Sequence, residues 1–186
     1  IAIKIRTLEL LSVFDMLCLV ILIVIQTLAA MKMAVLNKLL EQRAYTDTHT
    51  GLPNKSACEE LLNNKETVGK HTACIMFDLN NLKIINDTKG HLMGDQLILN
   101  FARLLRNVIP QKDFVGRYGG DEFMVVIYNT SKTEIEDILK QLSREKDRLN
   151  SSGNNMPIDY ACGWAISDAD SECTIQMLLD KADYYM

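Results

Sequence analysis

Residues 113–128 read DFVGRYGGDEFMVVIY, two strand-forming runs (113–118 and 122–128) separated by two glycines. Valine, phenylalanine and tyrosine recur in both runs and favour extended backbone. A two-residue Gly-Gly connection predicts a tight hairpin, because both glycines accept a positive φ without a steric penalty. Asp121 and Glu122 directly follow the glycines, so we expect both carboxylates at the hairpin tip.

The elements predicted on either side of the hairpin alternate between helix and strand. Residues 72–79 form an apolar run that ends near Asp78 and is typical of a strand buried on both faces. Apolar side chains recur on one face of residues 94–108 and of residues 133–149, which predicts two amphipathic helices. Further predicted elements are helices at 55–64 and from 174 onward, a loop at 151–155 and a strand at 159–166. This order predicts an α+β fold, with antiparallel pairs in a central sheet and helices on its faces.

Residues 10–31 are strongly apolar, and Asp15 is the only charged residue among them. A helix of about 20 residues spans the hydrocarbon core of a bilayer, so the segment predicts one transmembrane helix. A buried core helix is the alternative, although the rest of the chain is too small to enclose a helix that is apolar all round. Residues 1–9 are then the remnant of whatever precedes the span.

Residues 32–46 continue the predicted helix as a stalk. Its apolar side chains follow i, i+3 and i+4 spacing: Val35, Leu36, Leu39 and Leu40. The spacing is typical of a short parallel coiled coil between two subunits and equally of a plain amphipathic linker, and both interpretations stay open. Gly51 and Pro53 then break the helix, and residues 47–186 are predicted to form the globular domain.

The charge balance restricts the partners of the protein. Twenty basic residues against twenty-four acidic ones give a formal net charge of −4. We therefore expect no nucleic-acid partner, because a broad nucleic-acid-binding surface requires a basic face. A small anionic ligand held by a metal and a few local cations remains compatible with this balance.

Asp78 and Asp121 are predicted to converge. Asp78 ends a buried strand, and an unpartnered carboxylate is costly in such a place. If the hairpin pairs beside this strand, the two carboxylates approach each other and repel unless a cation joins them. Mg²⁺ favours carboxylates together with substrate phosphates, as in two-metal phosphoryl transfer. Taken singly, each aspartate would be interpreted as an N-cap or a turn residue.

Four motifs resemble the GGDEF family of diguanylate cyclases. They are Asp47-Thr-His-Thr-Gly-Leu-Pro-Asn-Lys55, Asp78-Leu-Asn-Asn-Leu-Lys-Ile-Ile-Asn-Asp87, Gly90-His-Leu-Met-Gly-Asp95 and Arg117-Tyr-Gly-Gly-Asp-Glu-Phe123. A lone Gly-Gly-Asp-Glu arises by chance, whereas four motifs in the right order and spacing do not. The resemblance extends from about residue 46 to residue 186. It implies a palm-like core similar to that of nucleotide polymerases and class III cyclases.

The resemblance also implies a reaction. Two GTP molecules would condense to cyclic di-GMP with release of two pyrophosphates, in bacterial second-messenger signalling. The enzyme would be a homodimer joined through the stalk and the catalytic domains. Asp78, Asp121 and the backbone carbonyl of Leu79 would bind Mg²⁺, or Mn²⁺ in its place. Glu122 would assist the metal or the deprotonation of the attacking 3′-hydroxyl.

Asn86 and Asp95 would hold the guanine, again by resemblance. The chemistry of the two side chains agrees, because an amide with a carboxylate matches the O6 acceptor and the N1–H and N2–H donors of guanine. A site built on such hydrogen bonds rejects adenine strongly.

Lys83 would meet the phosphates, and His91 would lie close to the substrate. A lysine offers a mobile point charge that suits phosphate oxygens. For Lys83 and His91 the alternatives are a surface ion pair and a turn residue, respectively. Gly119 and Gly120 would bring their backbone amides close to the substrate, where a Cβ atom would obstruct it.

The compartment follows from the substrate. Nucleoside triphosphates are cytosolic, so we expect the GGDEF domain in the cytoplasm and residues 10–31 in the inner membrane, as the single or last span. A catalytically silent module that senses GTP or cyclic di-GMP is the alternative. The retained metal aspartates and glycines favour an active enzyme.

Two features depart from the family pattern. Many members carry an inhibitory Arg-x-x-Asp site for the product, and here Asp113 is present but Pro110 replaces the arginine. Proline cannot supply a bidentate guanidinium, so we predict that this site is lost. Residues 180–186 resemble the start of the family's last helix, and its phosphate-binding Lys and Arg residues and a closing strand are expected beyond Met186.

Overall fold

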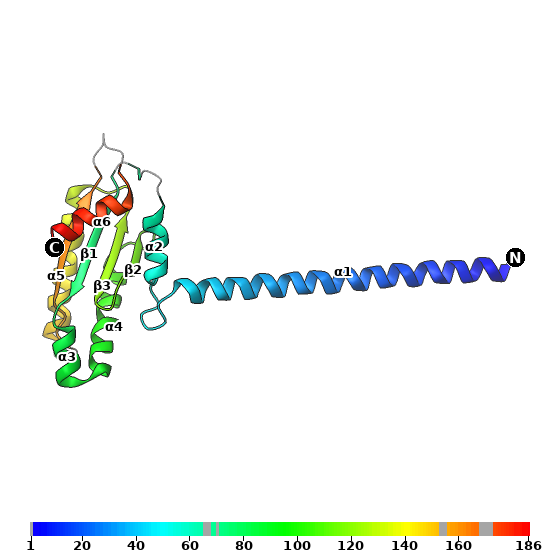
Figure 1. The fold of residues 1–186 in the computed structure, drawn as a ribbon, viewed down its shortest axis with the longest axis horizontal. Coiled ribbons are helices and arrows are strands. Elements are labelled where there is room, and N and C mark those ends of the chain that lie inside the picture. The colour runs from blue at the N-terminus through cyan, green and yellow to red at the C-terminus, as the bar shows by residue number, and fades with distance from the viewer. Residues whose placement is uncertain (1, 65–67, 70, 153–155, 168–172) are drawn as a thin grey trace. The chain divides into compact units, whose positions relative to one another are not determined.

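The computed structural model describes residues 2–64, 68–69, 71–152, 156–167 and 173–186. The chain forms two compact units, Ile1–Ala44 and Tyr45–Met186 (Figure 1). A single helix, α1 (Ala2–Tyr45), makes up the first unit.

The second unit is a four-stranded antiparallel sheet covered by helices. Its strands are β1 (Ala73–Leu79), β2 (Phe114–Arg117), β3 (Glu122–Ile127) and β4 (Tyr160–Ile166), in the spatial order β2-β3-β1-β4. Its helices are α2 (Lys55–Asn63), α3 (Leu82–Lys89), α4 (His91–Val108), α5 (Lys132–Ser151) and α6 (Ile175–Tyr184). The predicted α+β class, with a hairpin beside the first strand, is confirmed.

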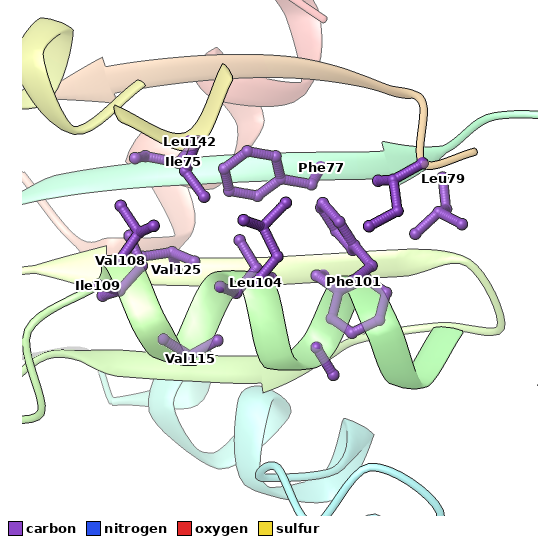
Figure 2. Packing of buried hydrophobic residues seen from close by; sticks show 14 of the residues in the cluster. Ile75, Phe77, Leu79, Phe101, Leu104, Val108, Ile109, Val115, Val125 and Leu142 are labelled. Carbon is purple, nitrogen blue, oxygen red and sulfur yellow. The ribbon is translucent and has the colours of Figure 1, made fainter. Parts of the chain in front are cut away.

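β1 lies inside the sheet and is buried on both faces, as its apolar run predicts. On one face Ile75 and Phe77 pack in a cluster with α4 and α5, and Phe77 meets the ring of Phe101 edge-on at 5.8 Å. Figure 2 shows this layer, with the side chains of β1 facing those of α4. On the other face Cys74 and Met76 pack with α2 and α6. Successive side chains of β1 therefore point to opposite faces of the sheet and contribute to two separate hydrophobic cores.

The sequence prediction was wrong at residues 82–93. The structure has a helix, α3, where none was predicted, and α4 begins at His91 rather than at residue 94. Asn81 and Gly90 bracket α3 with φ angles of 66° and 85°. An eight-residue helix is too short for apolar periodicity to distinguish it from a loop. The positive φ of Gly90, which glycine adopts without a steric penalty, allows a second helix to follow at once.

α1 runs without a break through the predicted span and the stalk. Within the described residues it is the one helix long and apolar enough to cross a membrane, and an 18-residue window of it has a mean hydropathy of 2.5. Its large apolar side chains between Val13 and Leu40 are 46–68% exposed. Nothing in the described part of the chain covers them.

The connector after α1 is held closed by Asp47. Its carboxylate accepts hydrogen bonds from the backbone N–H and the hydroxyl of Thr50, at 2.8 and 2.6 Å. It also pairs with Arg117 of β2 at 3.3 Å. Burial opposes the ionisation of Asp47, but the bonds from Thr50 and the charge of Arg117 outweigh it and lower the pKa of Asp47 below its ordinary value of 3.8.

We expect Asp47→Asn to destabilise the domain by about 1–2 kcal/mol at neutral pH, because charge-assisted hydrogen bonds are lost. A lowered pKa means that this contribution is present above the ordinary value of 3.8 and is lost as the pH falls through the folded value. Urea unfolding of the detergent-solubilised chain should therefore show a constant difference from wild type down to about pH 5, and a shrinking one below about pH 4. The control is Thr48→Ala, an exposed neighbour. A difference that does not change with pH would contradict this account of Asp47.

We expect the protein to sediment with membranes after cell breakage and to require detergent for extraction, because the apolar surface of α1 is not covered by protein. Fractionation followed by high-salt and alkaline washes tests this. Recovery of the intact chain in the soluble fraction would rule out a span.

Candidate active site

Two carboxylates meet where β1 ends and β3 begins. In the β1–β3 pair, Asp78 lies opposite Glu122, and the N–H of Leu79 donates to the carbonyl of Asp121 at 3.0 Å. Burial and the negative charge of Asp121 raise the pKa of Asp78 above its ordinary value. The structure thus brings Asp78 and Asp121 together, and their charges repel each other.

The carboxylate oxygens at the end of β1 suit a hard cation as ligands. The described residues contain no group of three or more His, Cys, Asp or Glu side chains that could hold a metal by themselves. Two carboxylates beside a strand end are therefore an incomplete set of ligands. Mg²⁺ commonly takes one or two carboxylates and fills its remaining positions with substrate phosphates and water. Burial is the larger cause of the raised pKa of Asp78 and the charge of Asp121 is the second, and such a cation would relieve the repulsion.

The hairpin differs from the predicted two-residue turn. β2 ends at Arg117 and β3 begins at Glu122, and the N–H groups of Tyr118 and Gly119 both donate to the carbonyl of Glu122. Neither glycine has a positive φ, so the predicted conformational reason for them was wrong.

Gly119 is required for a steric reason, because its neighbour Glu122 leaves no room for a side chain. A Cβ atom there would lie 2.3 Å from the carboxylate oxygen of Glu122, which folds back over the turn. At Gly120 a Cβ atom would meet nothing within 4 Å. A side chain at Gly119 would therefore displace Glu122, one of the predicted catalytic residues.

Arg117 fixes the tip of the hairpin. Its guanidinium donates to the carbonyl of Gly120 at 2.8 and 3.3 Å and pairs with Asp47 of the connector. The backbone N–H of Arg117 also donates to the carbonyl of Pro53. The connector and the hairpin are thus one hydrogen-bonded unit. Sequence reasoning quoted these residues within motifs and assigned them no role.

The predicted guanine-reading pair lies on the adjoining helices. A Cβ atom at Gly94 would lie 2.0 Å from Oδ1 of Asn86, so the Asn86 amide packs directly on the first turn of α4. The carbonyl of Asn86 accepts from the N–H of Gly90 at 2.9 Å and closes the turn between α3 and α4. Asp95 follows Gly94 and is exposed. The structure therefore brings Asn86 and Asp95 to neighbouring turns.

Lys83 and His91 are exposed residues of the first turns of α3 and α4. Within the described part of the chain, neither side chain forms a hydrogen bond or an ion pair. The surface ion pair considered for Lys83 is absent from these residues, and both side chains are available to a ligand.

His49 was missed by the sequence reasoning. Its Nε2 lies 3.0 Å from the carbonyl oxygen of Asp95. Arg106 of α4 donates to the carbonyl of Gly51 in the same connector. The connector therefore contacts the hairpin at one end and α4 beside Asp95 at the other. No pattern in the sequence indicates a contact between residues 46 positions apart.

A cavity of about 450 Å³ lies where the family's inhibitory site is expected. It is lined by Pro110 and Asp113, and Arg106 is the one cation among its described lining residues. One carboxylate oxygen of Asp113 accepts from the N–H of Tyr128, and the other is buried without a partner in the described structure. Because residue 110 is a proline, the cavity has no guanidinium fork at that position, and Arg106 donates to the carbonyl of Gly51.

The sequence profile of a known family, described as "Diguanylate cyclase, GGDEF domain", matches residues 44–186. The signaling protein YkoW of Bacillus subtilis is 31% identical over 156 residues, 80% of this chain and 19% of YkoW. The diguanylate cyclase DgcP of Pseudomonas aeruginosa is 31% identical over 147 residues, 76% of this chain and 22% of DgcP. Other relatives of similar identity are named cyclic di-GMP phosphodiesterases.

The fold agrees with these matches. The coiled coil and GGDEF domain of DgcB from Caulobacter crescentus, solved with c-di-GMP, superposes with a TM-score of 0.73 at 22% identity and covers 86% of this chain and 87% of that one. The chain spans about a fifth of the length of the first curated relatives that it matches. The profile match and the palm-like fold, with its Gly-Gly-Asp-Glu hairpin, show that this chain belongs to the GGDEF-domain family of cyclic di-GMP signalling.

Proposed function

We propose that this domain is an active diguanylate cyclase, which condenses two GTP molecules to cyclic di-GMP and two pyrophosphates. The observation that carries the proposal is the pair of neighbouring carboxylates, Asp78 and Asp121, at the end of β1, where burial and like charge raise the pKa of Asp78. A structural role does not require two repelling carboxylates. A site for a cation and a triphosphate does.

The residues divide into two groups by chemistry. Asp78, Asp121 and the Leu79 carbonyl would hold Mg²⁺ or Mn²⁺, which when bound neutralises phosphate charge and favours ionisation of the attacking hydroxyl. Glu122, beside Gly119, would accept the 3′-hydroxyl proton or steady the cation. The backbone N–H of Gly120 would face the phosphates, whereas the N–H of Gly119 donates to the carbonyl of Glu122.

Substrate selection falls to α3 and α4. Asn86, held on Gly94, and the exposed Asp95 present an amide and a carboxylate on adjacent turns. This pair complements the edge of guanine and would leave a carboxylate facing a lone pair of adenine. The exposed Lys83 would meet phosphate oxygens, and His91 would lie beside the substrate.

A symmetric product needs two substrates. Each domain would hold one GTP, so two domains must face each other before either 3′-hydroxyl reaches the partner's α-phosphate. Tethering both domains to one membrane through α1 raises their effective concentration and favours the homodimer. GTP is cytosolic, which places the domain on the cytoplasmic side of the inner membrane.

A silent GTP or cyclic di-GMP sensor is the second candidate. It is suggested by the relatives that are named phosphodiesterases. The retention of Asp78, Asp121 and Glu122 together with both glycines favours the cyclase, because a sensor has no need of the repelling pair.

We expect membranes that contain the full-length protein to convert GTP to cyclic di-GMP with Mg²⁺, and Asp121→Asn to reduce the rate by about 100-fold or more, because one metal ligand is lost. Chromatography of the product measures this. Asp183→Asn, an exposed carboxylate on α6, is the matched control. The enzyme proposal would be refuted if the folded wild type made no product, or if the variant made product at an undiminished rate.

The same substitution should have the opposite effect on stability. A raised pKa for Asp78 means that its ionised form penalises the fold, so the penalty is present at neutral pH and absent below the ordinary value of 3.8. Without Mg²⁺, Asp121→Asn should therefore melt at a higher temperature than wild type at pH 7 and at the same temperature near pH 3.5, roughly. Mg²⁺ with GTP should stabilise only the wild type. A lower melting temperature for the variant at pH 7 would contradict the repulsion.

We expect turnover to be insensitive to micromolar cyclic di-GMP, because the cavity at Pro110 lacks the arginine fork. Pro110→Arg should restore inhibition and lower the inhibition constant about tenfold or more, since bidentate guanidinium–phosphate contacts are strong. Gln141→Arg, which adds an arginine on the exposed face of α5 and outside the lining of this cavity, is the control. Strong non-competitive inhibition of the wild type by micromolar product would show that the site persists.

A further inference from the structure

Two strongly polar side chains, Asp15 and Gln26, interrupt the apolar part of α1. Their neighbour Thr27 needs no partner outside the helix, because its hydroxyl donates to the carbonyl of Val24 at 2.9 Å. The amide of Gln26 differs. It is exposed on the helix surface, and in the described part of the chain it has no hydrogen-bond partner. In hydrocarbon such an amide is costly, because no water is present to satisfy it.

Asp15 and Gln26 lie on one side of α1. Three turns of an α-helix take about 11 residues, the separation of the two side chains. Apolar residues continue the same stripe at alternating spacings of four and three. We call this stripe the seam, and its members are Asp15, Leu19, Leu22, Gln26, Ala29, Met33, Leu36 and Leu40.

The seam crosses from the predicted span into the stalk. Because α1 is continuous from Ala2 to Tyr45, the repeat keeps its phase over about three and a half heptads. All of its large apolar members are about half exposed or more, from Leu36 at 46% to Met33 at 59%. Every residue from 16 to 25 is apolar, so the seam is distinguished there by its polar members, and in the stalk by Met33, Leu36 and Leu40, which keep the four-three spacing of a helix that packs along another helix.

We propose that the seam is the surface on which the α1 helix of a second copy of this chain packs in parallel, with the two Gln26 amides paired across it inside the membrane. A primary amide carries both a donor and an acceptor, so two identical copies satisfy each other across a twofold axis. A polar residue at one a position fixes the register and the number of helices. Ala29, the next member, lets the backbones approach closely.

The second copy suits this surface better than a different membrane protein. Its helix carries the same amide at the same depth, which the symmetric pair requires. The parallel direction rests on the proposed function, since two cyclase domains must lie on the same side of the membrane to share a reaction. The seam itself follows from α1 alone.

Disulfide mapping in native membranes tests the seam. The full-length chain would carry Cys18→Ser, which removes the exposed cysteine of α1. Single cysteines would then be placed at Leu22 or Ala29 on the seam, and at Val24 or Met31 as controls. Each control lies two residues from its seam position, at nearly the same depth and on the opposite side of the helix. Mild oxidation should give several-fold more dimer from Leu22→Cys and Ala29→Cys.

The role of Gln26 is tested in the Leu22→Cys background. Gln26→Leu should reduce the yield of dimer several-fold, whereas Gln26→Asn, which keeps the amide, should retain most of it. Three outcomes would overturn the seam. They are equal yields of cross-linked dimer on both sides of the helix, a maximum yield at Val24 and Met31, and a cross-linked partner of a different mass. Recovery of the wild type in the soluble fraction would also overturn it.

Cyclic di-GMP measured in the same membranes separates this proposal from the proposed function. Product without a seam pattern would refute the seam and leave the cyclase standing. A seam pattern without product would refute the cyclase and support the helix pair.

Discussion

β1 and β3 pair from Ala73 opposite Ile127 to Asp78 opposite Glu122, and both the fold and the candidate site depend on this register. Each strand alternates between two apolar cores, so a slip of one residue would turn every side chain to the wrong face. The same register sets the Leu79 N–H against the Asp121 carbonyl. The free energy gained by burying both cores therefore holds together two carboxylates that repel each other, at the place where we propose a cation.

A second layer of contacts holds the loops around this strand pair. Arg117 joins the tip of the hairpin to Asp47, and His49 reaches the carbonyl of Asp95. One short connector therefore contacts the hairpin near the predicted metal ligands and the helix that carries the predicted guanine ligand. Because charged hydrogen bonds are directional, such contacts fix the position of backbone that has no regular structure. The connector is also the segment that directly follows α1 in the chain.

In α1, unlike in the domain, the large apolar side chains are exposed rather than buried in a core. In water its exposed apolar side chains would be a liability, and in a bilayer they are the ordinary state. The informative groups there are polar. The Thr27 hydroxyl is satisfied within its own helix and the Gln26 amide is not, and the proposed helix pair would satisfy that amide.

The sequence by itself determined the class of the fold, the hairpin, the buried first strand and the long apolar helix, because these depend on local periodicity, turn chemistry and composition. The sequence also predicted that Asp78 and Asp121 lie close together, because a hairpin that pairs beside the first strand brings the two strand ends side by side. The tertiary structure decided what depends on distant contacts. It revealed α3, which is too short to show a period, the spatial need for Gly119 beside Glu122, and the contacts of Arg117 and His49. These contacts join residues far apart in the chain, and no local pattern encodes such a distance.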